Sequence, residues 1–203
     1  MNPFFNEDHR SIREMARDFA NKTLAPLAAG IDQTEEFPME VVQQMADLGF
    51  LGLKIPEEYG GLGLDMRSYV CVMEEIAKKC ATATLFISSA NSLSTAPIVI
   101  SGTPEQKEKY LPGIVAGEEM IAFGLTEPNA GSDAASMTTK AVEDGDSYIL
   151  NGRKCFITMA PISKYSIIYA KTTPEKGAKG ISCFMVDMSL PGVSCGKHEE
   201  KMG

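Results

Sequence analysis

The sequence lacks several features that would place it in a common class of proteins. It has no excess of basic residues: 19 lysines and arginines against 27 aspartates and glutamates leave a net charge of −8 on 203 residues. This balance argues against nucleic acid and anionic membrane as partners. The first ten residues are polar and acidic and do not resemble a secretory signal. The most apolar stretch, 83–100, contains several serines, an asparagine and a proline, so it indicates a buried helix and no membrane span.

The chain also lacks the cysteine and histidine patterns of metal and thiol sites. Its five cysteines include no Cys-x-x-Cys pair, and it has two histidines. Such a set indicates reduced structural thiols, so we expect a cytoplasmic protein without a metal site. Cys195 and His198 stand at a Cys-x-x-His spacing but have no further candidate ligands. A cysteine nucleophile would need one of the two histidines brought near it.

Two motifs of nucleotide and acyl chemistry are absent as well. The glycines at 60, 61 and 63 follow no predicted strand, and no third glycine stands at the position that the dinucleotide fingerprint requires. They therefore indicate a flexible turn. Gly131 and Ser132 do not stand in the Gly-x-Ser-x-Gly pattern of a nucleophile elbow. The apolar fraction of 44% with 23% charged residues is that of an ordinary folded protein.

Helical periodicity runs through the first half of the chain, with charged residues between the apolar positions. Pro26 lies just after the first helical pattern, and Pro38 opens the second. Thr103 is the expected N-cap of the last, with Pro104 at its first helical position. We predict helices over 12–24, 39–48, 66–79, 83–101 and 104–115.

After residue 117 the pattern changes to short apolar runs separated by turns. Glu143-Asp-Gly-Asp146 is a hairpin signal between two of these runs. We predict strands over 120–125, 138–142, 148–150, 154–159, 165–170 and 181–186. The chain is therefore expected to be α+β, with an N-terminal α-helical domain over 1–115 and a β domain over 116–203.

The segment 123–133 carries the clearest functional signal. It begins apolar and then breaks into a loop with several donors, namely Thr126, Asn129, Ser132 and backbone N–H groups. Such a loop suits a flat polar ring at one end and a phosphate at the other. A second segment, 154–159, ends near another hydroxyl, Thr158. Both threonines also fit ordinary strand positions, and Phe156 fits either the core or the face of a bound ring.

Taken together, these two segments resemble the acyl-CoA dehydrogenase family. Thr126-Glu-Pro-Asn-Ala-Gly-Ser-Asp133 matches its flavin loop T-E-P-x-A-G-S-D, and Asn151-Gly-Arg-Lys-Cys-Phe-Ile-Thr158 matches N-G-x-K-x-[WF]-I-T. Segments 56–65, 91–93 and 102–111 are similar to its helical domain. The resemblance implies an N-terminal all-α helical domain followed by a truncated antiparallel β-barrel-like domain. It also implies that the middle, flavin-binding β domain is incomplete and that the C-terminal helical bundle is absent.

The resemblance further implies an FAD site. One group of residues would contact the isoalloxazine ring from one side, a second group would meet the pyrophosphate, and a third would contact the ring from the other side. Ser132 would also touch the CoA part of the substrate. In chain order these groups are Phe123, Leu125 and Thr126; Gly131 and Ser132; and Phe156, Ile157 and Thr158.

Family members oxidise an acyl-CoA thioester to its trans-2-enoyl-CoA in fatty acid metabolism and pass the electrons to electron-transfer flavoprotein. The family's glutamate base lies in the C-terminal bundle, so we assign no catalytic residue and expect this chain to be inactive alone. A homotetramer is expected for the full-length protein. An acyl-CoA oxidase or enoyl-CoA reductase of the same fold, or a non-catalytic acyl-CoA-binding or scaffold fragment, are the alternatives. Leu85, Phe86 and Ile87 would lie on or near the acyl pocket, or belong to the core.

Overall fold

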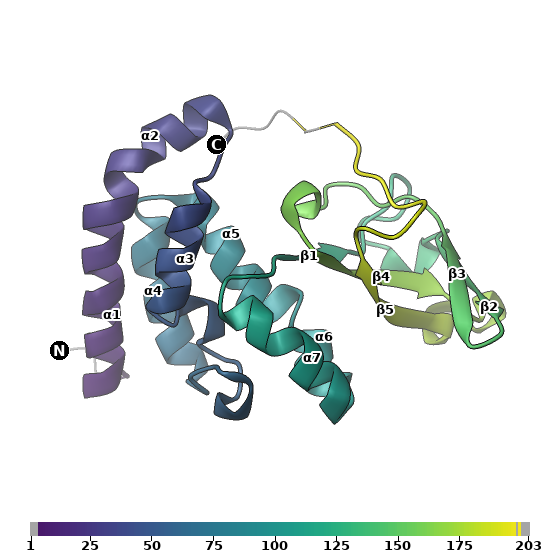
Figure 1. Cartoon of the computed structure of the whole chain (residues 1–203), viewed down its shortest axis with the longest axis horizontal. Helices are drawn as coiled ribbons and strands as arrows, with labels where there is room; N and C mark the ends of the chain where they lie inside the picture. Colours follow the sequence, from purple (N-terminus) through teal and green to yellow (C-terminus); the bar gives the residue numbers. More distant parts are fainter. Residues whose placement is uncertain (1–3, 198, 200–203) are drawn as a thin grey trace. The chain divides into compact units, whose positions relative to one another are not determined.

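The computed structural model describes residues 4–197 and 199 and divides them into two units. The first unit ends at Glu119 and is helical, whereas the second begins at Met120 and is built on a five-stranded sheet. Figure 1 shows the helices in purple to teal and the strands in green to yellow. The α+β fold class predicted from the sequence is confirmed.

Among its described residues, 4–119, the first unit has seven α-helices, and two five-residue π-helical segments, η1 and η4, extend two of them. The predicted helix over 12–24 does not stop before Pro26, because that proline lies in the first turn of the next helix, where a backbone N–H has no intrahelical partner. The elements are α1 Glu7–Phe19, η1 Ala20–Leu24, α2 Ala25–Thr34, α3 Met39–Asp47, α4 Met66–Ala77, α5 Ala81–Ser88, η4 Ser89–Leu93, α6 Ala96–Ser101 and α7 Pro104–Val115.

Side-chain caps define where α4 and α7 begin. Gln106 N donates to the Thr103 hydroxyl at 3.3 Å, and Thr103 N donates to the Gln106 side chain at 2.9 Å, which confirms the predicted N-cap of α7. At α4, Ser68 N donates to the Asp65 carboxylate at 2.9 Å. Asp65 also lies 3.1 Å from His9 Nε2, so the start of α4 is tied to α1.

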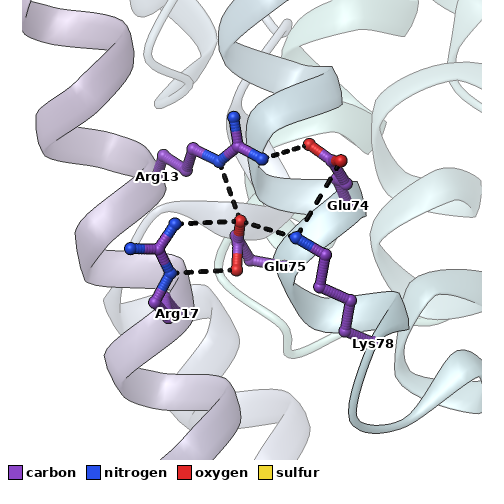
Figure 2. Close-up of polar contacts among 5 residues, drawn as sticks. All are labelled: Arg13, Arg17, Glu74, Glu75 and Lys78. Atoms are coloured by element: carbon purple, nitrogen blue, oxygen red, sulfur yellow. Dashed lines mark hydrogen bonds and ion pairs between the residues drawn. The ribbon is translucent and has the colours of Figure 1, made fainter.

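A buried carboxylate holds α1 against α4 (Figure 2). The Glu75 side chain is 4% exposed and accepts hydrogen bonds from Arg13 Nε at 2.8 Å, Arg17 Nε at 3.1 Å and Lys78 Nζ at 3.0 Å. The hydrogen bond from Arg17, followed by those from Arg13 and Lys78, lowers the pKa of Glu75 to about 2, against the opposing effect of burial. The carboxylate therefore stays charged at any ordinary pH.

The run Ala81–Ser101 is long and apolar enough to cross a membrane, and it is the one such helix among the described residues. Half of its apolar window is buried inside the structure. Its Asn91 side chain donates to Phe50 O at 2.7 Å and accepts from Lys54 N at 2.9 Å. A buried amide bonded on both sides to a neighbouring loop is what a core helix needs, in agreement with the sequence prediction.

The sheet of the second unit is organised around β4 (Figure 1). Strand β5 pairs antiparallel along the whole of β4, and β1 pairs parallel with its first four residues. Lys140 of β2 pairs parallel with Lys171 at the end of β4, and β3 forms an antiparallel hairpin with β2. The strands are β1 Ile121–Gly124, β2 Lys140–Asp144, β3 Ser147–Asn151, β4 Tyr165–Lys171 and β5 Ile181–Asp187.

This sheet differs from the predicted antiparallel β-barrel-like domain. It is mixed, and no pairing among the described strands closes it. The long connection 125–139 returns the chain so that β2 runs in the same direction as β1, and both strands are parallel to β4. Short apolar runs locate strands in a sequence but do not encode the direction in which a long loop returns.

Candidate functional site

The two segments singled out in the sequence meet beside one edge of β4. Because β5 covers the whole of the other edge, β1 and β2 must share this one, at opposite ends of β4. Between them the chain leaves the sheet after Gly124 and returns at Lys140. The donor-rich loop 125–139 therefore starts and ends on the same edge of the sheet.

A tight turn gives the first part of this loop its shape. Glu127 N donates to Ala130 O at 3.0 Å, and Ala130 N donates to Glu127 O at 3.1 Å, with Pro128 and Asn129 at the tip. The Ser136 hydroxyl donates to Asp133 O at 2.8 Å and stabilises the next turn. Hydrogen bonds internal to the loop thus set the backbone that carries the donors.

The carboxylate of Glu127 lies at the centre of the loop. Oε2 accepts from Thr138 N at 2.6 Å and from the Thr138 hydroxyl at 2.8 Å. Oε1 accepts from Thr139 N at 3.0 Å, from the Thr139 hydroxyl and from Lys154 Nζ at 2.9 Å. Lys154 Nζ also donates to Leu125 O at 3.0 Å. The Glu127 side chain therefore binds the end of the loop and Lys154 of the second motif segment, and Lys154 in turn binds the start of the loop.

These contacts keep Glu127 charged although its side chain is 2% exposed. Burial acts to raise its pKa, but the hydrogen bonds from Thr139, Lys154 and Thr138 outweigh burial and hold the pKa well below its usual range. In the sequence alone, Glu127 is a motif residue without an assigned role. The one signal of a role is its negative charge next to Thr126 in a donor-rich motif, a charge that Asp133 shares.

The second segment does not form the predicted strand over 154–159, so that prediction is wrong. Phe156 and Met159 adopt left-handed backbone conformations, with φ of 57° and 62°, which interrupt a strand on both sides of Ile157 and Thr158. Cys155 N donates to Thr126 O at 2.9 Å and joins the segment to the loop. Phe156 is 74% exposed as a residue, which rules out the core interpretation.

The predicted site residues lie in three places. Phe123 is in β1, where its ring meets the edge of Tyr169 at 5.5 Å between centroids. Leu125 and Thr126 are half-buried and lie next to Lys154 and Cys155 through the bonds given above. Gly131 and Ser132 follow the tight turn and are exposed, and Ile157 is half-buried between the exposed Phe156 and Thr158. The structure thus joins 125–126 to 154–155, and no hydrogen bond in the described chain links 131–132 to 156–158.

The donors around this point suit a flat polar ring attached to a phosphate. The hydroxyls of Thr126, Ser132 and Thr158 have no hydrogen-bond partner among the described residues, and neither do the N–H groups of Gly131 and Ser132. A Cβ on Gly131 would meet no atom of the chain within 4 Å, so its backbone faces open space. Unpaired donors beside an open backbone match the acceptor-rich edge and pyrophosphate of FAD.

Two other predicted features lie elsewhere. Of the three residues suggested for an acyl pocket or the core, Ile87 is fully buried and Phe86 packs against Phe37 with centroids 4.6 Å apart. Leu85 is 43% exposed. In the Cys195–His198 pair, His198 lies outside the described residues. Within 4–197 and 199, no group of three histidine, cysteine or acidic side chains forms a candidate metal site.

Comparison with protein families gives two matches that together span nearly the whole chain. Residues 6–118 match the acyl-CoA dehydrogenase N-terminal domain, and residues 122–203 match the acyl-CoA dehydrogenase middle domain.

Two curated relatives are more than half identical to this chain. A 3-(aryl)acrylate reductase of Clostridium sporogenes is 54% identical over 98% of this chain and 53% of its own length. Subunit CarC of the caffeyl-CoA reductase–Etf complex of Acetobacterium woodii is 51% identical over the same shares. The chain thus spans about half the length of the curated relatives it matches.

Solved structures show the same fold. Butyryl-CoA dehydrogenase of Megasphaera elsdenii is 38% identical with a TM-score of 0.93, covering 100% of this chain and 54% of that one. An acyl-CoA dehydrogenase of Bacillus anthracis complexed with FAD is 33% identical with a TM-score of 0.90, covering 100% and 35%.

Proposed function

Because the chain belongs to the acyl-CoA dehydrogenase family, we propose that it supplies the flavin-contacting part of an FAD-dependent enzyme. The enzyme would act on the α,β carbon–carbon bond of an acyl-CoA thioester, with electron-transfer flavoprotein as its redox partner. The observation that carries this proposal is the set of unpaired donors on two segments joined by the Cys155–Thr126 hydrogen bond. Bound FAD would supply hydride transfer at the β-carbon.

The chain's own residues would bind and orient the cofactor. The hydroxyls of Thr126 and Thr158 would donate to the polar edge of the ring, and the exposed Phe156 ring would cover part of its face. The N–H groups of Gly131 and Ser132 would bind the pyrophosphate, and Ser132 would also contact the CoA moiety. Phe123, Leu125 and Ile157 would complete the apolar contacts. We assign no catalytic base, since Glu127 is buried, paired and too weakly basic for that role.

A second direction of reaction has its own support. The two curated relatives described above are a 3-(aryl)acrylate reductase and a subunit of a caffeyl-CoA reductase–Etf complex. We therefore also propose reduction of an aryl-substituted 2-enoyl-CoA as the second candidate. Steady-state assays of the complete enzyme with both redox forms of electron-transfer flavoprotein distinguish the two directions.

The proposal extends to the setting of the enzyme. The cysteines of the described chain are free, which suits a reducing, cytoplasmic location. A role in fatty acid metabolism and a homotetramer of the full-length protein are part of the same proposal, on the basis of family resemblance.

Replacing Gly131 with alanine tests the proposed pyrophosphate contact. The added Cβ would meet no protein atom within 4 Å, so the melting temperature should not change. Because the methyl group would fill the space needed by a phosphate close to the backbone, the dissociation constant for FAD should rise at least about tenfold. Flavin fluorescence titration measures the affinity.

Gly196→Ala is the matched control, since a Cβ there also meets no atom within 4 Å and the residue lies outside the site. Wild-type affinity in Gly131→Ala would remove this residue from the site. Failure of the wild-type chain to bind FAD at all would contradict the cofactor proposal.

Phe156→Asn should separate stability from binding. Asparagine tolerates the left-handed conformation that costs phenylalanine about 1 kcal/mol, so the free energy of unfolding should rise by about 0.5–1 kcal/mol. The affinity for FAD should fall because the ring is lost. Glu35→Asn is the control, since Glu35 has φ 58° at the end of α2; it should gain similar stability and leave FAD binding unchanged. A loss of stability without a loss of affinity in Phe156→Asn would show that the ring packs on the protein instead.

A further inference from the structure

We propose that Glu127 and Lys154 are positioning residues that hold the two cofactor-contacting segments, 125–133 and 155–158, at a fixed separation. The inference rests on the proposed FAD site but concerns the protein's own geometry. Neither side chain is placed to touch a ligand, because Glu127 is 2% and Lys154 8% exposed. Their effect would pass through the backbone groups they bind.

The contacts of Lys154 and its neighbour Cys155 bind the start of the loop. Lys154 Nζ lies 3.0 Å from Leu125 O and 2.9 Å from Glu127 Oε1, so the ammonium group holds the loop through one main-chain and one side-chain oxygen. The next residue, Cys155, donates its N–H to Thr126 O at 2.9 Å. Lys154 and Cys155 are thus fastened to consecutive carbonyl groups of the loop, immediately before Phe156.

The Glu127 carboxylate holds the end of the loop, at Thr138 and Thr139. Its five donors come from Thr138, Thr139 and Lys154, residues separated from Glu127 by 11 to 27 positions in the chain. With donors on both oxygens, the carboxylate plane cannot rotate without breaking at least one bond. Thr138 and Thr139 are the last residues of the loop before β2. Their hydrogen bonds therefore fix the orientation of the Glu127 carboxylate relative to the sheet.

A buried ion pair contributes more to arrangement than to stability. Removing two charges from water costs about as much as their attraction returns, so an apolar pair of similar size often gives equal stability. An apolar pair would not fix the distance between two backbone segments, because dispersion contacts have no preferred direction. The Glu127–Lys154 ion pair therefore suits a site whose hydrogen-bond donors must keep fixed positions relative to a rigid ring.

Hydrogen exchange tests the geometry without any cofactor. In Lys154→Met, which keeps the length of the side chain and removes its charge, the Cys155 amide should exchange at least about tenfold faster than in the wild type. Amides of the β4–β5 pairing should keep their protection. The isosteric Glu127→Gln should show the same pattern. Unchanged exchange at Cys155 in both variants would overturn the inference, whether or not the chain binds FAD.

Flavin binding is the second readout. Both single variants should raise the FAD dissociation constant at least about tenfold and shift the absorption spectrum and the reduction potential of the bound flavin. Glu75→Gln is the matched control, since it also removes a buried charge but lies in the helical unit. It should lower stability and leave the flavin spectrum unchanged. If the flavin spectrum and the FAD affinity changed in proportion to the loss of stability in all three variants, Glu127 and Lys154 would have a merely structural role.

The double variant Glu127→Gln/Lys154→Met separates charge from position. Removing both charges should recover part of the melting temperature lost in each single variant, while exchange at Cys155 stays fast and FAD binding stays weak. If the double variant fully recovered the melting temperature, the slow exchange at Cys155 and the FAD affinity, the pair would only balance charge. That result would overturn the inference. Thr138→Val, which loses one hydroxyl donor to Glu127 and keeps the ion pair, offers a milder change with the same expected order of effects if either single variant fails to fold.

Discussion

Glu75→Gln is expected to lower the free energy of unfolding of the helical unit by about 3 kcal/mol at neutral pH. The substitution removes the one buried anion that faces Arg13, Arg17 and Lys78 in the α1–α4 contact (Figure 2). The magnitude follows from the pKa of Glu75, about 2 in the folded chain against 4.5 for an unperturbed glutamate, since each pKa unit corresponds to about 1.4 kcal/mol.

The same shift predicts how this stability depends on pH. Because the folded-state pKa is depressed, the contribution is complete above pH 4.5, the unperturbed value, and disappears as the pH falls through about 2. At about pH 3 the difference between wild type and Glu75→Gln should be about half its neutral value. Denaturant unfolding followed by far-ultraviolet circular dichroism, which the helices dominate, measures both differences.

Glu74→Gln is the control for this prediction. Glu74 lies next to Glu75 on α4 and shares Arg13 and Lys78 as partners, but its side chain is 49% exposed. An exposed pair is screened by water, so the loss should stay below about 1 kcal/mol. Equal effects of the two substitutions would show that burial does not strengthen the Glu75 cluster.

Gly152→Ala should destabilise the sheet unit by about 3 kcal/mol and weaken FAD binding. An alanine Cβ at this position would stand 2.2 Å from the Thr139 hydroxyl oxygen and 2.6 Å from its Cβ. Thr139 is buried and β-branched, so it has little freedom to rotate away. Its displacement would break the hydrogen bonds that its N–H and hydroxyl donate to Glu127.

Hydrogen exchange of the β4–β5 amides and flavin fluorescence titration measure the two effects. Gly131→Ala is the matched control for stability, because Gly131 is an exposed loop glycine of the same unit whose Cβ would meet nothing within 4 Å. It should reduce only FAD binding. Wild-type stability in Gly152→Ala would show that the loop after β3 moves aside and that Thr139 does not depend on this glycine.

Local signals were sufficient for much of the fold. The Thr103 cap and Pro104 placed the start of α7 correctly, because a helix N-terminus depends on residues within one turn. The hairpin at Glu143–Asp146 was also predicted, since its turn residues lie directly between the two strands. The mixed, open sheet was not, because strand direction depends on where the long loops return.

The prediction of a strand over 154–159 is wrong for a different reason. The aromatic and apolar residues of this segment are typical of a strand, but the Cys155–Thr126 hydrogen bond and the anchoring of Lys154 to Leu125 O hold it beside a loop. Phe156 and Met159 then adopt positive φ values that no propensity predicts. Contacts between distant residues overrode a local preference of about 1 kcal/mol or less.

By itself, the sequence determined the family and the two donor-bearing segments, because both are short motifs whose chemistry lies in neighbouring residues. Only the tertiary structure decided how those segments are joined. Glu127 is one of 27 acidic residues in the sequence, and its role depends on Thr138, Thr139 and Lys154 meeting it in a place closed to water. A buried charge is stable only where the fold brings its partners to it. The distances between Glu127 and its partners are therefore a property of the folded chain.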